Sequence, residues 1–125
     1  MIEPVVKGVY VADISGDKKL GRHRSTKHCV CVSVGAGKYL LINTHHRDEY
    51  DDFQINAENY DFLNGVDRFL SCREPRVIQP EKLLERVGTL SDADTKILYA
   101  KIETSKKIRK FDKLDILPEL WKTFR

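Results

Sequence analysis

The residues with the clearest chemical potential lie in the short segment 71–76, which reads Ser-Cys-Arg-Glu-Pro-Arg. This segment follows a run of strand-forming residues that begins at Val66, and it contains Arg73 and Arg76. An arginine-flanked strand end can bind a phosphodiester, because guanidinium groups match phosphate oxygens in charge and geometry. The segment therefore predicts chemistry on a phosphate. If the strand continued unbroken, Glu74 would point to the side opposite Arg73.

A second group of cations lies in a polar, glycine-containing stretch between two predicted strands. Residues 18–28 hold five Lys or Arg side chains, two histidines and no acid: Lys18, Lys19, Arg22, His23, Arg24, Lys27 and His28. Residues 48–61 are instead acidic, and residues 106–125 carry seven Lys or Arg against three acids. The net charge is only +3, so the asymmetry, rather than the total, favours an anionic partner on one face. Solvated loops would give the same pattern, and this interpretation stays open.

Two further histidines, His45 and His46, directly follow Thr44 at the end of a predicted strand. Imidazole titrates near neutrality, so it can act as a general acid or a general base. His23 in the basic stretch is a third candidate for proton transfer. Simple solvent exposure of each side chain is the competing interpretation.

The three cysteines fit a structural role better than a chemical one. Cys29 and Cys31 lie two positions apart in an apolar run, so both face the same side of a strand. With His28 and Cys72 they could form a zinc site, but the spacing is not that of a zinc knuckle. Buried thiols that act as small hydrophobic side chains suit the run better. An odd number of cysteines also argues against a disulfide framework and favours a reducing cytoplasm.

Length and composition indicate one soluble domain. The chain has 125 residues, of which 41% are hydrophobic and 33% charged, and this suits a single core of modest size. It has no apolar run of about 18 residues and no secretory pattern, so a cytoplasmic protein without a membrane span is expected. No nucleotide fingerprint or phosphate loop stands out, so neither a cofactor nor a metal is expected.

Alternating and β-branched runs predict the strands that must position these groups. Six are expected, over residues 5–13, 29–34, 38–44, 53–55, 66–72 and 76–78. The near-continuous apolarity of residues 29–34 predicts burial on both faces of that strand. The turn Gly35-Ala-Gly37 would join it to the next strand in a hairpin. Short antiparallel strands in this number are most readily buried as a small coiled barrel.

After residue 78 the apolar period changes from two to 3.6. Pro80 at a first helical position and Gly88 as a left-handed cap predict a short helix over residues 81–87. The stretch from Val66 would then be a strand, a turn and a capped helix in succession.

Two more helices are expected beyond it. Ser91-Asp-Ala-Asp94 forms a capping box that starts a helix running to about Ser105. A third helix is predicted by apolar residues on one face: Leu117, Leu120, Trp121 and Phe124. Pro118 would sit near the start of this helix, where it is tolerated. The fold class is therefore mainly β with C-terminal helices (α+β), with residues 1–105 as the body and residues 106–125 as a basic, amphipathic extension of the same domain.

Several stretches together resemble the MazF/PemK family, the endoribonuclease toxins of bacterial toxin–antitoxin pairs. They are, in order, the opening strand (8–13), the strand after the basic loop (27–33), the strand that ends in a functional threonine (40–44), the PemK-type strand with a cysteine and a Pro-Arg pair (71–78) and the C-terminal pair (from 81). The agreement covers roughly residues 7–105 and lies in the order and spacing of the stretches.

This resemblance implies a small SH3-like antiparallel barrel that forms a homodimer with a groove for single-stranded RNA. It also implies cleavage without a metal, by attack of a ribose 2′-OH on the adjacent phosphate. Such a reaction needs a base for the 2′-OH, an acid for the departing 5′-oxygen and cations for the phosphorane. A cognate acidic antitoxin, with an extended segment that blocks the groove, is the implied protein partner.

The resemblance also assigns residues to this reaction. The family's loop arginine falls on Lys27, for which Arg24 could substitute. The family's threonine falls on Thr44, which would hydrogen-bond the scissile phosphate. Routine loop and strand-end roles for these residues remain the alternative.

The acid–base positions of the PemK branch carry Ser71 and Arg73, which are not an ordinary acid–base pair. Proton transfer would then fall to His45 or His46. The candidates are, as catalytic residues, Lys27, Thr44, His45, His46 and Arg73, and, as RNA-binding residues, Arg22, His23, Arg24, Ser71 and Arg76.

A second function from another class stays open, in which the same barrel has lost its chemistry and binds nucleic acid or protein. The loop cations and Thr44 favour the enzyme. The missing acid–base pair at Ser71 and Arg73 favours the binding module.

Overall fold

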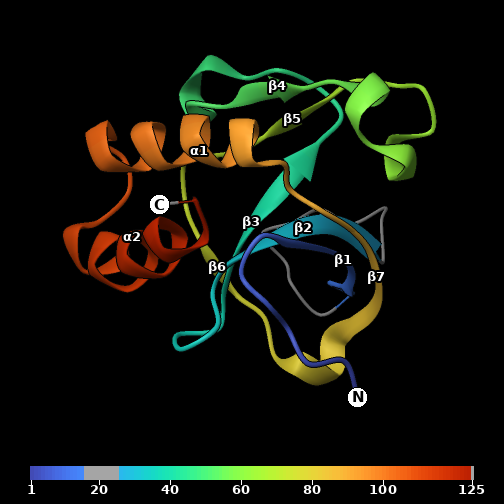
Figure 1. The fold of residues 1–125 in the computed structure, drawn as a ribbon, viewed down its shortest axis with the longest axis horizontal. Helices are drawn as coiled ribbons and strands as arrows, with labels where there is room; N and C mark the ends of the chain where they lie inside the picture. The colour runs from blue at the N-terminus through green and yellow to red at the C-terminus, as the bar shows by residue number, and fades with distance from the viewer. Residues whose placement is uncertain (16–25, 125) are drawn as a thin grey trace.

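The computed structural model describes residues 1–15 and 26–124, and within them seven strands precede two α-helices (Figure 1). The strands are β1 (Gly8–Asp13), β2 (Thr26–Ser33), β3 (Lys38–Asn43), β4 (Phe53–Ile55), β5 (Arg68–Leu70), β6 (Arg76–Val77) and β7 (Leu83–Thr89). The helices are α1 (Asp92–Thr104) and α2 (Lys110–Phe124). The mainly antiparallel α+β class predicted from the sequence is confirmed.

The strands pair in the order β4-β5-β3-β2-β1-β7, with β6 on β3, and each recorded pairing is antiparallel. Figure 1 shows β3 running from the layer of β1, β2 and β7 to the small ribbon of β4 and β5. Register shifts in the β1–β7 and β2–β3 ladders add local twist, so the sheet coils. In the described ranges no ladder joins β4 to β7, and the sheet is therefore open rather than closed into a barrel.

The central strands are buried on both faces, as the apolar run in residues 29–34 predicts. Val30 and Leu40 belong to a core that also contains α1 and α2 residues. Cys29 and Leu41, one position along each strand, belong to a second core on the opposite face. The predicted hairpin is confirmed, and Gly37 adopts the positive φ of 64° that its turn requires.

The three cysteines are free thiols buried in these two cores. Burial raises the pKa of each to about 12, which keeps the thiols protonated and unreactive at neutral pH. In the part of the chain that the structure describes, no group of three or more His, Cys, Asp or Glu is placed to hold a metal ion.

The helix predicted over residues 81–87 is wrong, because this segment is strand β7, entered through a 3₁₀ turn at Pro80–Lys82. Pairing with β1 overrides the local helical period, a common outcome for a short amphipathic segment. Gly88 is likewise not a left-handed cap. A Cβ there would meet the ring of Phe62 at 3.1 Å, so the glycine makes room for that ring.

The N-cap predicted at the start of α1 is confirmed, since Ser91 Oγ accepts a hydrogen bond of 3.1 Å from the backbone N–H of Asp94. The reciprocal bond of a capping box is not formed, because the Ser91 N–H donates to the Tyr60 hydroxyl, at 3.0 Å. Helix α2 is longer than predicted. Because it begins at Lys110, Pro118 lies in its interior rather than near its start, and the missing N–H leaves the carbonyl of exposed Leu114 without that helical partner. Within the described residues, neither helix is both long and apolar enough to cross a membrane.

Helix α2 is fastened to the β2–β3 hairpin by three acids on its inner side. The ammonium group of Lys38 lies 2.6 Å from Asp112 and 2.5 Å from Asp115. Glu119 accepts hydrogen bonds from Ser33 Oγ and from the backbone N–H of Val34. These contacts join residues more than 70 positions apart, so the segment after residue 105 packs as part of the same body.

We expect Lys38→Met to lower the free energy of unfolding by roughly 2 kcal/mol, because it leaves the buried Asp112 carboxylate without its counter-charge. Urea denaturation of the purified chain measures this. Asp115→Asn is the matched control, since Asp115 is 43% exposed and its neutralisation should cost well under 1 kcal/mol. Equal, small losses in the two variants would contradict the anchoring role of Lys38.

Candidate functional site

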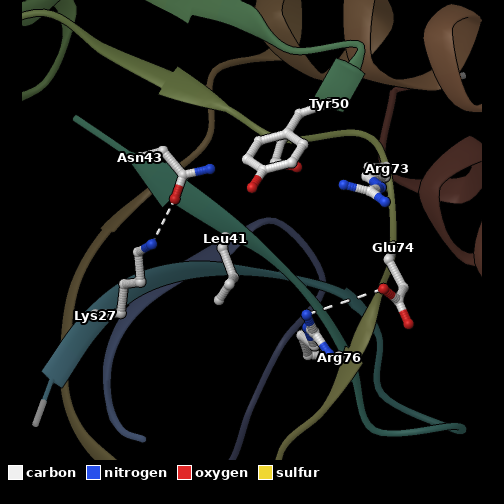
Figure 2. Close-up of a pocket in the computed structure, with 8 residues that line it drawn as sticks. Lys27, Leu41, Asn43, Tyr50, Arg73, Glu74 and Arg76 are labelled. Atoms are coloured by element: carbon white, nitrogen blue, oxygen red, sulfur yellow. Dashed lines mark hydrogen bonds and ion pairs between the residues drawn. The ribbon is translucent and has the colours of Figure 1, made fainter. Parts of the chain in front are cut away.

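A small polar pocket of about 160 Å³ lies over the second core, between the end of the β2–β3 hairpin and the segment before β6 (Figure 2). We name it the arginine pocket, and it is lined by Lys27, Leu41, Asn43, Tyr50, Ser71, Arg73, Glu74 and Arg76. Its volume is below that of a typical small-molecule site, so it suits one charged group of a larger ligand.

One wall of the arginine pocket comes from β2 and β3. The pairing of Cys29 with Leu41 puts Lys27 opposite Asn43, and the Lys27 ammonium group donates a hydrogen bond to Asn43 Oδ1. Because side chains two apart share a face, Lys27 and Asn43 extend the face that carries Cys29 and Leu41. The regular ladder therefore fixes the position of this cation.

The other wall comes from residues 71–76, where the chain leaves the sheet and returns to it. Ser71 still donates its N–H to Leu41, at 2.9 Å, but β5 has already ended at Leu70. The irregular backbone lets the consecutive residues Arg73 and Glu74 line the same pocket, which an unbroken strand would forbid. The strand is broken here, so Glu74 does not point to the side opposite Arg73.

Glu74 and Arg76 bring opposite charges together at this wall, with 3.9 Å between Glu74 Oε2 and Arg76 Nη2. Figure 2 shows Glu74 between Arg73 and Arg76, with Lys27 on the opposite side of the pocket. The backbone of Arg76 is fixed in position, because β6 pairs this residue with Tyr39 of β3. The arrangement places three cations and one carboxylate around a single space.

Tyr50 covers the pocket from the 3₁₀ turn Asp48–Tyr50. The guanidinium carbon of Arg73 lies 5.3 Å from the centre of the Tyr50 ring, and that of Arg47 lies 5.7 Å from it. These are cation–π distances, so the ring orients Arg73. The Tyr50 hydroxyl points into the space between Asn43 and Arg73 (Figure 2).

The structure brings together four of the residues predicted from the sequence. Lys27, Ser71, Arg73 and Arg76 all line the arginine pocket. Arg22, His23 and Arg24 lie outside the described residues.

Thr44 and the two adjacent histidines do not line the arginine pocket. Thr44 follows Asn43, so it belongs to the opposite face of the sheet, where it lines a second pocket of about 460 Å³. His45 is exposed and lines neither pocket.

His46 is engaged in the loop that carries Tyr50. Its Nδ1 contacts the buried carboxylate of Asp52, and its Nε2 lies 2.7 Å from Asp48. The hydrogen bonds to Asp52 and then Asp48 raise the pKa of His46 above its ordinary value. Since both ring nitrogens are occupied, this arrangement favours a bracing role over proton transfer.

Three polar residues of the arginine pocket were not among the candidates: Asn43, Tyr50 and Glu74. The turn at 35–37 alone would set residue 43 opposite residue 29, and the observed pairing with residue 27 depends on the register shift between Cys31 and Ser33. Tyr50 has no sequence signal, since it reaches the pocket from a 3₁₀ turn in an acidic loop.

Comparison with known proteins does not identify the chain. No family model matches it, and no curated protein matches it. The function must therefore be argued from the geometry of the site. Three cations can bind a phosphate group and stabilise negative charge that develops on it, while a carboxylate beside them can accept a proton.

We expect the stabilising contribution of His46 to depend on pH. Its pKa is raised in the folded state, so the contribution is fully present below the unfolded pKa of about 6.5 and is lost as the pH rises through the folded value. The measurement is the difference in free energy of unfolding between the wild type and His46→Gln, by urea denaturation at pH 6 and pH 9. A difference that stays constant between these pH values would contradict the assignment.

Proposed function

We propose that the protein is a metal-independent endoribonuclease that cleaves single-stranded RNA by attack of a ribose 2′-OH on the adjacent phosphate. One observation carries the proposal: Lys27, Arg73 and Arg76 converge on one pocket around Glu74. Few chemical groups other than a reacting phosphate need several fixed cations and a neighbouring proton acceptor in so small a space. A phosphodiester undergoing internal transfer needs both.

The cations would hold the scissile phosphate. Arg73 and Arg76 present guanidinium groups that can contact two phosphate oxygens at once, while Lys27 acts as a point charge from the opposite wall. Asn43 would take the positioning role that the resemblance assigns to Thr44, because Asn43 is the residue hydrogen-bonded to Lys27.

Glu74 and Tyr50 would carry the protons. The Glu74 carboxylate accepts the proton of the 2′-OH as the 2′-oxygen forms a bond to phosphorus. The bond from phosphorus to the 5′-oxygen then breaks, and the departing oxygen takes a proton from the Tyr50 hydroxyl. The products are a 2′,3′-cyclic phosphate and a free 5′-OH, and solvent takes the proton from Glu74 and returns one to Tyr50.

The resemblance to the MazF/PemK family supports this function. In this proposal the chain is a divergent relative with an SH3-like arrangement of its strands, acting in the cytoplasm as a homodimer. An acidic antitoxin segment would then inhibit it by occupying the cationic arginine pocket. The antiparallel order of β1, β2 and β3 and the helix after β7 are in keeping with it.

A non-catalytic RNA-binding module is the second candidate. Ser71 and Arg73 at the acid–base positions favour it, and so does the ion pair that links Glu74 to Arg76. In this case the arginine pocket would bind the RNA backbone without cutting it.

The first test is cleavage of single-stranded RNA by the purified chain in the presence of a chelator, followed by gel electrophoresis. We expect Glu74→Gln to slow cleavage by about 100-fold or more, the range expected for loss of a general base. Lys27→Ala and Arg76→Ala should also weaken RNA binding. Arg109→Gln is the matched control, since it removes one exposed positive charge on the approach to α2, away from the pocket lining.

The two candidate functions give different results in this experiment. RNA that is bound but stays intact supports the binding module and rules out the enzyme. RNA that is neither bound nor cut rules out both. Expression of the wild-type chain in bacteria adds a second readout, because growth arrest relieved by Glu74→Gln is expected of a toxin.

A further inference from the structure

A second, larger pocket lies on the opposite face of the sheet from the arginine pocket, at the same end of the β2–β3 hairpin. We name it the aromatic pocket; its volume is about 460 Å³, and the lining residues relevant here are His28, Thr44, Phe62, Asn64, Val66 and Arg68. This volume lies in the range of sites that hold a small molecule or one unit of a polymer.

The two pockets meet at Lys27. His28 follows Lys27 and therefore points to the opposite face of β2. Thr44 follows Asn43 and points to that same opposite face at the end of β3. Lys27 lines both pockets. A polymer whose phosphate binds in the arginine pocket can therefore reach the aromatic pocket around the end of the sheet.

The aromatic pocket contains two neighbouring aromatic rings, which we call its ring pair. The rings of His28 and Phe62 lie 5.4 Å apart between centroids, with an interplanar angle of 36°. Phe62 also packs against Gly88, where a Cβ would come within 3.1 Å of the ring, and against Tyr60, at 5.6 Å between centroids. These contacts position the Phe62 ring before any ligand binds.

Polar side chains around the ring pair are available to a ligand. Among the residues that the structure describes, the side chains of His28, Thr44, Asn64 and Arg68 make no hydrogen bond or ion pair with one another or with any other residue. Burial, and then the charge of Arg68, lower the pKa of His28, so its ring is neutral at pH 7. A neutral imidazole offers one donor and one acceptor, which suits the edge of a base.

We propose that the aromatic pocket is a subsite for one base of the RNA strand whose phosphate lies in the arginine pocket. The base stacks on Phe62 and His28, and Thr44, Asn64 and Arg68 contact its polar edge. Sequence-tolerant stacking on aromatic rings is a general way to hold single-stranded RNA. The inference rests on the proposed function, since it takes RNA as the ligand of the arginine pocket.

The test is binding of a fluorescent single-stranded RNA oligonucleotide with 2′-fluoro sugars, which lack the attacking hydroxyl, to the purified chain. Fluorescence anisotropy at one fixed salt concentration gives the dissociation constant. We expect Phe62→Leu to weaken binding about tenfold, as for loss of one base–aromatic stack. Phe111→Leu, an exposed aromatic on α2, is the matched control and should leave the dissociation constant unchanged.

A second ligand separates base recognition from a structural effect. A backbone of the same length with abasic units keeps the phosphates and lacks the bases, so its affinity should not respond to Phe62→Leu. An equal loss for the two ligands, or no loss for either, would overturn the subsite. Arg68→Gln, a change at another lining residue of the pocket, should repeat the base-dependent loss if Phe62→Leu unfolds the chain.

These outcomes can be told apart from failure of the proposed function. Cleavage that depends on Glu74, combined with binding that is insensitive to Phe62, removes the subsite and leaves the enzyme. Base-dependent binding without cleavage leaves the subsite in a non-catalytic RNA-binding protein. Absence of RNA binding by the wild type overturns both.

Discussion

The burial of β2 and β3 on both faces is the constraint on which the rest of the structure depends. One face packs against α1 and α2, and the other encloses Tyr39 and the thiols of Cys29 and Cys31. A sheet with two cores must keep its register, because a slip by one residue would exchange every side chain between them. The same register determines on which face of the sheet each polar residue at the end of this hairpin lies.

The fixed register divides the residues at the open end of the hairpin between the two faces of the sheet. Lys27 and Asn43 continue the face of the second core and reach the arginine pocket, whereas His28 and Thr44 continue the other face. The segment 71–76 completes the first pocket because it leaves the ladder. Regular structure thus fixes one wall, and an irregular connection supplies the groups that a strand could not place side by side.

The sequence allowed the fold class, the hairpin, the N-cap of α1 and four residues of the arginine pocket to be predicted. Each has a local signal, such as an apolar run, a glycine turn or a cluster of arginines. The prediction of a helix over residues 81–87 was wrong because β7 is defined by its pairing with β1, a contact between distant parts of the chain. Thr44, named from the resemblance, lies next to Asn43 but lines the other pocket, since a shift of one position changes the face of the sheet. Tyr50 lay beyond reach, because its place depends on a loop braced by His46 and Asp52.

The bonds between α2 and the β2–β3 hairpin have a consequence for the order in which the molecule forms. Ser33, Val34 and Lys38 find their acceptors on Asp112, Asp115 and Glu119, more than 70 positions later. During synthesis the hairpin therefore emerges from the ribosome well before the helix that completes its contacts. Until α2 has been made, the strands that carry Lys27 and Asn43 lack part of their support, so a growing chain holds its cationic pocket less firmly than a finished one.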